Sequence, residues 1–331
     1  MGNKRTALGE YAALLIIWVG LLLLFGILGE NFLSRQTFSA LANRIPTLTV
    51  VAAGMTMVLV IGGLDLSVGS VQGLSGALLG MAMVAWHWPL WAAAALSLGC
   101  GLIAGTLNGC ISMLLSIPSF IVTLGMLEVA RGLAYLTSHS QTKYIGASVT
   151  GLSDPIKSLG ISPAVVITAL VIVGGQITLS LGVFGRHLIA IGSNQEAARL
   201  SGINPIPAKI AVFALLGALT GLGAIFYTSR LGSADPNAGV GLELSAIAAV
   251  VIGGTSLMGG RGSVVKSFFG VLIIATLEAG LAQVGASEPV KRVITGMVIV
   301  VAVIFDAWRD DAAGRKFAAL KRLFRGKHES L

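Results

Sequence analysis

The chain has 331 residues, of which 55% are hydrophobic and 11% charged, and its mean hydropathy is +0.89. A water-soluble domain carries about a quarter charged residues, so this composition excludes a soluble globular protein and indicates one integral membrane domain. The formal net charge of +8 does not indicate nucleic-acid binding, because seven of the 22 basic residues lie between Arg309 and Lys327, beside the last apolar stretch. Juxtamembrane bases of this kind attract anionic lipid and mark the cytoplasmic side of a bilayer.

Ten apolar stretches follow one another along the chain. The first, Tyr11–Gly29, has nineteen uncharged residues and no cleavage site after it, which predicts an uncleaved membrane helix rather than a signal peptide. The other nine are predicted at residues 46–62, 66–86, 89–117, 118–137, 163–184, 210–228, 242–257, 264–284 and 290–307. We therefore expect an all-α integral membrane protein of about ten transmembrane helices, with residues 1–331 forming a single domain. Residues 308–331 form a basic cytoplasmic tail, either a short amphipathic helix on the inner leaflet or a disordered segment.

The distribution of basic residues predicts the orientation. With ten spans and the N-terminus inside, fourteen bases fall on the cytoplasmic side and eight on the other. This bias has the sign of the positive-inside rule, so both termini are expected in the cytoplasm. The fourteen are Lys4, Arg5, Arg186, Arg199, Lys209, Arg261, Lys266 and the seven bases of the tail.

Glycine spacing predicts how the helices pack. Gly101, Gly105 and Gly109 recur every four residues in one span, and Gly217 and Gly221 repeat that spacing in another. Such small-residue faces let helix backbones approach closely, so they indicate packing surfaces rather than a substrate site. Cys100 and Cys110 fall in the same predicted helix, about 15 Å apart, which is too far for a disulfide.

Two similar phrases open the third and the eighth predicted spans. Gly63–Ser67 reads Gly-Leu-Asp-Leu-Ser, and Gly241–Ser245 reads Gly-Leu-Glu-Leu-Ser. An offset of five spans reverses the direction of a helix, as in transporters built from inverted repeats. The match is either the trace of two inverted five-span halves or a coincidence of five residues.

A polar interval, Arg186–Lys209, separates two apolar stretches in the second half of the chain. Its middle, Asn194–Leu200, is rich in helix formers, with Ser193 or Asn194 placed to cap the start and Gly202 placed to end it. Pro205 and Pro207 then break the chain before the next span. The interval is either a surface connector or a short helix gripped from outside the bilayer.

Few polar residues lie inside the predicted spans. Asp65, with Ser67, is placed to cap the third helix or to bind a sugar hydroxyl or a neighbouring loop. Glu128 and Arg131 lie at i and i+3, so they either neutralise each other or line a translocation path that Asn108 could join. No nucleotide-binding P-loop, metal-ligand spacing or catalytic motif is present in the sequence, so we expect no enzymatic activity and no cofactor in this chain.

Three separated phrases resemble the permeases of ABC importers for ribose and similar monosaccharides. They are Gly192–Ile203, Gly63–Ser70 and Ala248–Gly262, and the resemblance extends from about Phe32 to Asp306. It implies that the first phrase docks into a cleft of an ATPase subunit, which binds the ATP. The coupling residues implied are Asn194, Glu196, Ala197, Ala198, Arg199, Ser201, Gly202 and Ile203.

The resemblance further implies a bacterial inner-membrane protein that pairs with a second permease, identical or not, and receives sugar from a periplasmic binding protein. Ribose is the first expectation for the sugar. The alternatives are an ion-driven secondary transporter, for which deep ionisable residues are few, and an ABC permease for another solute, such as an autoinducer-like sugar or a branched-chain amino acid.

Overall fold

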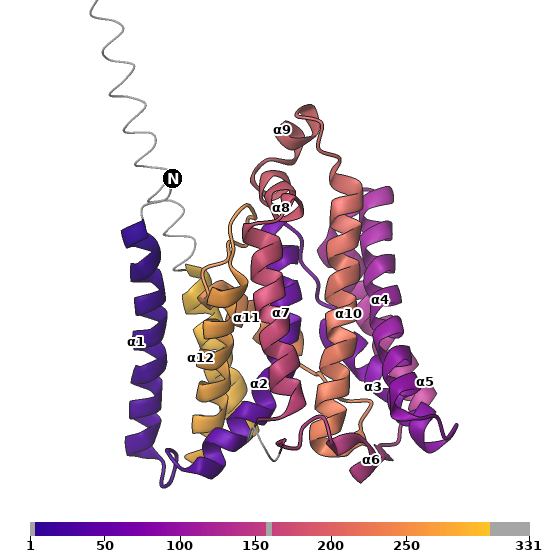
Figure 1. Ribbon diagram of the computed structural model, residues 1–331, viewed down its shortest axis with the longest axis vertical. Coiled ribbons are helices and arrows are strands. Elements are labelled where there is room, and N and C mark those ends of the chain that lie inside the picture. The colour runs from indigo at the N-terminus through magenta and orange to yellow at the C-terminus, as the bar shows by residue number, and fades with distance from the viewer. Residues whose placement is uncertain (1–3, 157–160, 305–331) are drawn as a thin grey trace, which may run out of the picture.

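The computed structural model describes residues 4–156 and 161–304, which form a bundle of helices (Figure 1). Within these residues seven helices have the length and apolar composition to cross a membrane. They are α1 (Lys4–Leu28), α2 (Arg35–Val60), α4 (Leu90–Leu114), α5 (Ser119–Ser138), α7 (Pro163–Ser180), α10 (Pro205–Leu231) and α12 (Val264–Gln283). Two shorter apolar helices, α3 (Val68–Val84) and α11 (Leu242–Ile252), and helical residues 288–304 match the other three predicted stretches. The predicted all-α integral membrane fold is confirmed, while the basic tail lies outside the described residues.

Short elements lie at both ends of the bundle. The helices α8 (Val183–Ser193) and α9 (Gln195–Leu200) project at the top of Figure 1, and α6 (Ala147–Thr150) lies at the bottom. Strands β1 (Lys143–Tyr144) and β2 (Ser233–Ala234) pair antiparallel, with Lys143 opposite Ala234. We refer to the two ends of the bundle as the α9 end and the α6 end. The α8 helix was not predicted as a separate element, because Arg186 and His187 made its sequence look like part of a loop.

The α2 helix is the centre of the core. Its residues from Thr49 to Val60 are all buried, and they form the main apolar cluster with parts of α7, α10, α11 and α12. Residues 30–45 were predicted to be a polar link, but α2 begins at Arg35, because the Ser34 hydroxyl accepts a hydrogen bond from the Thr37 amide at 3.3 Å. Pro46 lies inside the helix, and the turns before it run obliquely below the bundle (Figure 1).

The glycine faces of α4 and α10 pack backbone against backbone, as predicted. A Cβ atom on Gly101 would lie 2.1 Å from the carbonyl oxygen of Gly217, and one on Gly105 would lie 2.2 Å from that of Phe213. Only glycine allows this approach. The two helices therefore form one unit over several turns.

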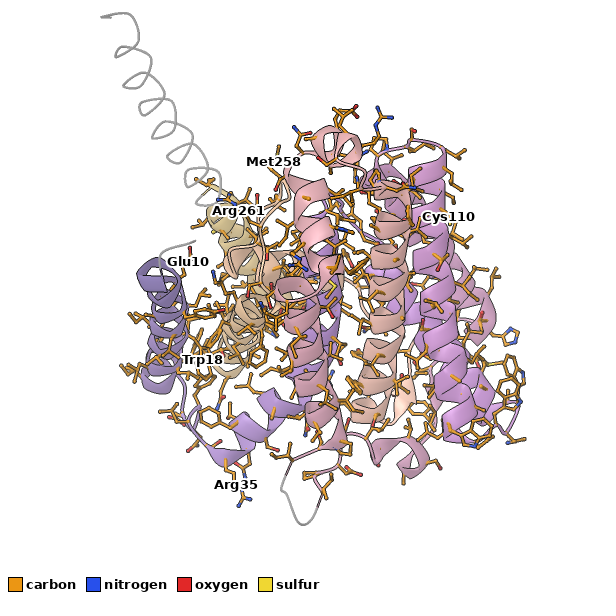
Figure 2. All side chains as sticks on the ribbon, turned by 45° about the horizontal axis from the view of Figure 1, so that its top comes forward. Glu10, Trp18, Arg35, Cys110, Met258 and Arg261 are labelled. Atoms are coloured by element: carbon orange, nitrogen blue, oxygen red, sulfur yellow. The ribbon has the colours of Figure 1, made fainter. Side chains whose placement is uncertain are left out.

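The α1 helix lies at the edge of the bundle beside α12 (Figure 1). Only 11% of the residues in its most apolar stretch are buried. Trp18, labelled in Figure 2, donates a hydrogen bond to Thr276 of α12 at 3.0 Å. Phe25 and Phe32 pack against Leu281 in a small apolar cluster of their own. The attachment of α1 is thus local, and the core is built by the other helices.

Two helices begin in the interior of the bundle rather than at its ends. The α3 helix is preceded by non-helical residues 62–67 and α11 by non-helical residues 235–241. Their starts meet, because a Cβ atom on Gly69 would lie 2.2 Å from the carbonyl oxygen of Gly239. From there α3 runs to the α6 end, where Gly80 lies against Ala234, and α11 runs toward the α9 end (Figure 1). Opposite directions are what an inverted repeat predicts, and a common origin of the two halves stays a prediction.

Candidate functional site

The α9 helix is a short helix defined at both ends. Asn194 is its N-cap, and its Oδ1 atom accepts a hydrogen bond from the Ala197 amide at 2.9 Å. At the other end Ile203 N–H donates to Ala198 O and Gly202 N–H donates to Arg199 O, both at 3.0 Å, with Gly202 at φ +85°. This is the hydrogen-bond pattern of a Schellman motif. The predicted start and stop signals of this helix are confirmed.

The side chains of α9 divide into an exposed face and a supporting face. Ala197 and Ser201 are exposed, and Leu200 is 79% exposed, whereas Ala198 is only 5% exposed. Of the two alanines expected to take part in coupling, Ala198 therefore packs against the protein itself, and Ala197 is the one that α9 exposes. Leu200 was not among the predicted coupling residues, although a large apolar residue in a polar interval is a signal that could have identified it.

One ion pair lies within α9, and one hydrogen bond joins α9 to α10. Arg199 donates to both carboxylate oxygens of Glu196, at 2.7 and 3.2 Å, and both side chains are about two-thirds exposed. The hydrogen bond and charge of Arg199 lower the pKa of Glu196 below its usual range. Lys209, in the first turns of α10, donates to Gln195 Oε1 at 2.7 Å. The helix is thus braced against the span that follows it.

A glycine-rich loop at residues 253–262 lies beside α8 at the same end of the bundle. Gly254, Gly259 and Gly260 have positive φ, which glycine adopts without strain, so the chain turns tightly here. Gly260 N–H donates to Val60 O at 2.8 Å, and Gly192 of α8 is pressed against both groups. Met258 is 82% exposed and lies with Arg261 at this end, far from Arg35 (Figure 2). Met258 and Leu200 are thus two large apolar side chains that are exposed at the α9 end.

A cleft of about 1010 Å³ lies between α9 and the interior of the bundle. It is lined by residues of the turn between α4 and α5, by Arg199 and Lys209, and by Gly63 at the start of the non-helical segment 62–67. The exposed helix is therefore separated from that segment only by open space and a few side chains.

Segment 62–67 is held by two side chains of α5. The Leu64 amide donates to Ser119 Oγ at 3.0 Å and the Leu66 amide donates to Thr123 Oγ1 at 3.1 Å. These bonds replace the helical ones that an extended backbone lacks inside a membrane protein. The segment is thus satisfied by α5 without being part of a helix.

Asp65 is the centre of a buried polar cluster in this segment. It is 2% exposed, and its Oδ1 atom accepts from the Ser67 amide at 2.8 Å and from the Ser67 hydroxyl at 2.7 Å. Asn108 of α4 donates to Ser67 Oγ at 3.0 Å and to Asp65 Oδ2 at 3.3 Å. The carboxylate lies at the start of α3, as predicted for a capping role, although it bonds the cap residue rather than the first turn. Asn108 bonds Asp65 and Ser67. It does not join Arg131, as the translocation-path alternative had proposed.

Arg131 and Glu128 do not pair in the described structure. Arg131 turns away and donates from one guanidinium nitrogen to the carbonyl oxygens of Pro236 and Ala238, at 2.5 and 3.0 Å. Glu128 is exposed on α5 and makes no hydrogen bond or ion pair with the described residues. Of the two alternatives for these residues, the self-neutralising pair is not formed, because two carbonyl acceptors of segment 235–241 hold the guanidinium; a place on the translocation path stays a prediction.

Glu243 is a second acidic residue near the start of α3. It lies in the first turn of α11, and its carboxylate is next to Gly69, where a Cβ atom would meet it at 2.2 Å. The carboxylate therefore faces the start of α3, where the positive end of the helix dipole favours a negative charge. The similarity of the two glycine phrases was the available signal that this residue lies in the interior.

Comparison with known proteins identifies the family. A family profile described as "Branched-chain amino acid transport system / permease component" matches residues 37–303. The fructose import permease protein of Rhizobium meliloti is 32% identical over 303 residues, covering 89% of this chain and 84% of that protein. The ribose import permease protein of Escherichia coli K12 is 35% identical over 296 residues, covering 88% and 92%.

An autoinducer 2 import system permease protein of Yersinia pestis is 34% identical over 298 residues, covering 90% of this chain and 84% of that protein. No solved structure matches the chain significantly. The profile extends from the first turn of α2 to the last described helix, and so includes α9, the segment 62–67 and the glycine-rich loop. The chain therefore belongs to the family of ABC-importer permeases that includes the ribose and fructose import permeases.

Proposed function

We propose that this chain is the permease subunit of an ATP-driven importer for a monosaccharide, with ribose as the first candidate. The α9 helix carries the proposal: it is capped at both ends, braced by Lys209, and exposed on one side where a partner can grip it. A helix of this kind transmits a push that a flexible loop would absorb. The relatives named for ribose, fructose and autoinducer 2 import support a small hydroxylated solute.

In this proposal an ATPase subunit binds α9 and holds the ATP, and the chain itself carries no cofactor and performs no covalent chemistry. A second permease completes the translocation path, and a binding protein delivers the sugar at the α6 end. The exposed Glu128 supports a second permease against α5, since a charged side chain in a span is unfavourable against lipid. Both termini lie in the cytoplasm, in agreement with the charge bias of the sequence.

Reconstitution tests the proposal. The chain is placed in proteoliposomes with the ATPase and binding protein encoded beside it, and uptake of radiolabelled ribose, fructose and leucine is measured with and without ATP. We expect ATP-dependent uptake of a sugar. Uptake by the chain alone, driven by a proton or sodium gradient, would show a secondary transporter instead, and uptake of leucine alone would assign the chain to amino acid import.

A further inference from the structure

A cavity of about 490 Å³ lies within the single chain at the α6 side of the point where α3 and α11 begin. Residues from α2, α3, α10, α11, α12 and the helix at 288–304 line it. Its volume is in the range of small-molecule binding sites. It is separate from the cleft under α9, with which it shares no lining residue.

Three polar atoms on the wall of this cavity have no partner among the described residues. They are Gln72 Oε1, Thr47 Oγ1 and Arg230 Nε. Gln72 is 1% exposed and Thr47 is 7% exposed, so water of the bulk does not reach them. Gln72 Oε1 lies 3.3 Å and the Thr47 carbonyl oxygen 3.4 Å from the Cβ position of Gly223, so both residues border the same turn of α10. Buried polar groups of folded proteins almost always have partners, so these three indicate a missing one.

The three atoms need different partners. Gln72 Oε1 only accepts a hydrogen bond, Arg230 Nε only donates one, and the Thr47 hydroxyl does either. A ligand hydroxyl group both donates and accepts, so a molecule with several hydroxyls can serve all three. An ionised carboxylate would satisfy Arg230 Nε but offers no donor to Gln72 Oε1.

Four cationic side chains and two carboxylates, Glu278 and Glu288, line the cavity, and Lys291 and Arg292 share the carboxylate of Glu288. Arg44 pairs with Glu278 at 2.5 Å, and Lys291 pairs with Glu288 at 3.3 Å. Ser245 also contacts Glu278, at 3.5 Å. Arg230 lies over the ring of Tyr227, 5.3 Å from its centroid, which offsets part of its charge. The wall thus keeps an excess of two cationic side chains over carboxylates, so the choice of a neutral ligand rests on the acceptor at Gln72 and the hydroxyl of Thr47.

We propose that this cavity binds a small neutral polyhydroxylated molecule of monosaccharide size, within one copy of the chain. The proposal rests on the proposed function only in naming a sugar as the hydroxylated ligand. It places a holding site between the α6 end and the meeting point of α3 and α11, in addition to any path formed between two permeases.

Binding to the purified chain tests the proposal. The chain alone, in detergent and without ATPase or binding protein, is titrated with ribose, fructose and sorbitol, and separately with inorganic phosphate and glycerol phosphate. We expect at least one of the neutral compounds to raise the thermal unfolding midpoint in a saturable way. Binding of phosphate compounds alone, or of no compound, would overturn the proposal.

Two variants localise the binding, and one matched variant serves as control. Thr47→Val and Gln72→Met keep the side-chain volume and remove the unpartnered groups, so the empty protein should be as stable as the wild type or more so. Both should weaken sugar binding about three- to tenfold. Thr168→Val makes the same change in α7, where a buried hydroxyl bonds Ala164 O away from the cavity, and should leave binding unchanged.

The outcomes separate the two proposals. Equal binding by wild type, Thr47→Val and Gln72→Met would remove the site from this cavity. Sugar uptake by the reconstituted importer without sugar binding by the chain would overturn the inference and leave the function standing. Binding without ATP-dependent uptake would do the reverse.

Discussion

Gly69 and Gly239 touch backbone to backbone, although they lie 170 positions apart in the sequence. Gly69 lies in the first turn of α3, and Gly239, at φ +78°, lies two residues before the glycine that caps α11. Two helices thus begin at one point in the interior and leave it in opposite directions. The contact fixes where both of them start.

Gly69→Ala is expected to lower the stability of the purified protein by about 1–3 kcal/mol or more, because the new methyl group would overlap Gly239 O and the Glu243 carboxylate. Thermal unfolding in detergent measures this. Gly76→Ala, two turns further along α3, is the control, since its methyl group would meet only Thr228 Oγ1 at 3.5 Å. Similar midpoints for the two variants would contradict the contact.

Ala197→Trp and Ala198→Trp should fail in different ways. Ala197 is exposed on α9, so its replacement should leave the unfolding midpoint unchanged and abolish co-purification of the ATPase. Ala198 is buried against the protein, so its replacement should lower the midpoint of the chain alone. If Ala197→Trp retained normal ATPase binding and normal stimulation of hydrolysis, α9 would not be the docking helix.

Gly202 ends α9 at φ +85° and has open space where a Cβ atom would lie. Gly202→Val should therefore be unfavourable through backbone strain alone, by about 1–2 kcal/mol, and should loosen α9 without disturbing the membrane helices. We expect a reduced yield of bound ATPase. Gly202→Asn, which tolerates this conformation, should keep most of it, and equal losses in both variants would argue against the strain.

Arg131 and Glu128 should behave independently. Arg131→Met leaves the carbonyls of Pro236 and Ala238 without their donor and should lower the yield of folded protein, whereas Glu128→Gln should not. The double variant should be no better than Arg131→Met, as measured by size-exclusion chromatography in detergent. Arg131→Lys, which keeps the charge with a different geometry, should be intermediate. Recovery in the double variant would show that the two side chains pair after all.

Asn194→Cys tests the orientation, in a chain whose free cysteines Cys100 and Cys110 have been replaced. With α9 in the cytoplasm, an impermeant thiol reagent should label this cysteine only after the cells are permeabilised. A cysteine at exposed Ser140, beyond the end of α5, is the control and should be labelled in intact cells. Labelling of Asn194→Cys from outside would reverse the topology.

Features that depend on residues close together in the sequence could be predicted. Apolar length identified the spans, and the Asn194 and Gly202 signals identified both ends of α9. Contacts between distant segments could not be read in this way. Arg131 and Glu128 looked like a pair because they are close on one helix, but the acceptors of Arg131 lie about a hundred residues further along. The burial of Ala198 beside exposed Ala197 depends likewise on which face of α9 rests on the protein.

The glycine contacts between α4 and α10 make α10 stiff. The helix begins four residues after α9 and runs for 27 residues, about 40 Å, to Gly232 beside β2. Because its backbone is seated against α4 along Gly101 and Gly105, it cannot bend there without parting that contact. The helix is therefore stiff, with one end next to α9 and the other next to segment 235–241. A tilt of α10 imposed at one face of the membrane would therefore arrive at the opposite face, where the turns of segment 235–241 and the start of α11 would be displaced together.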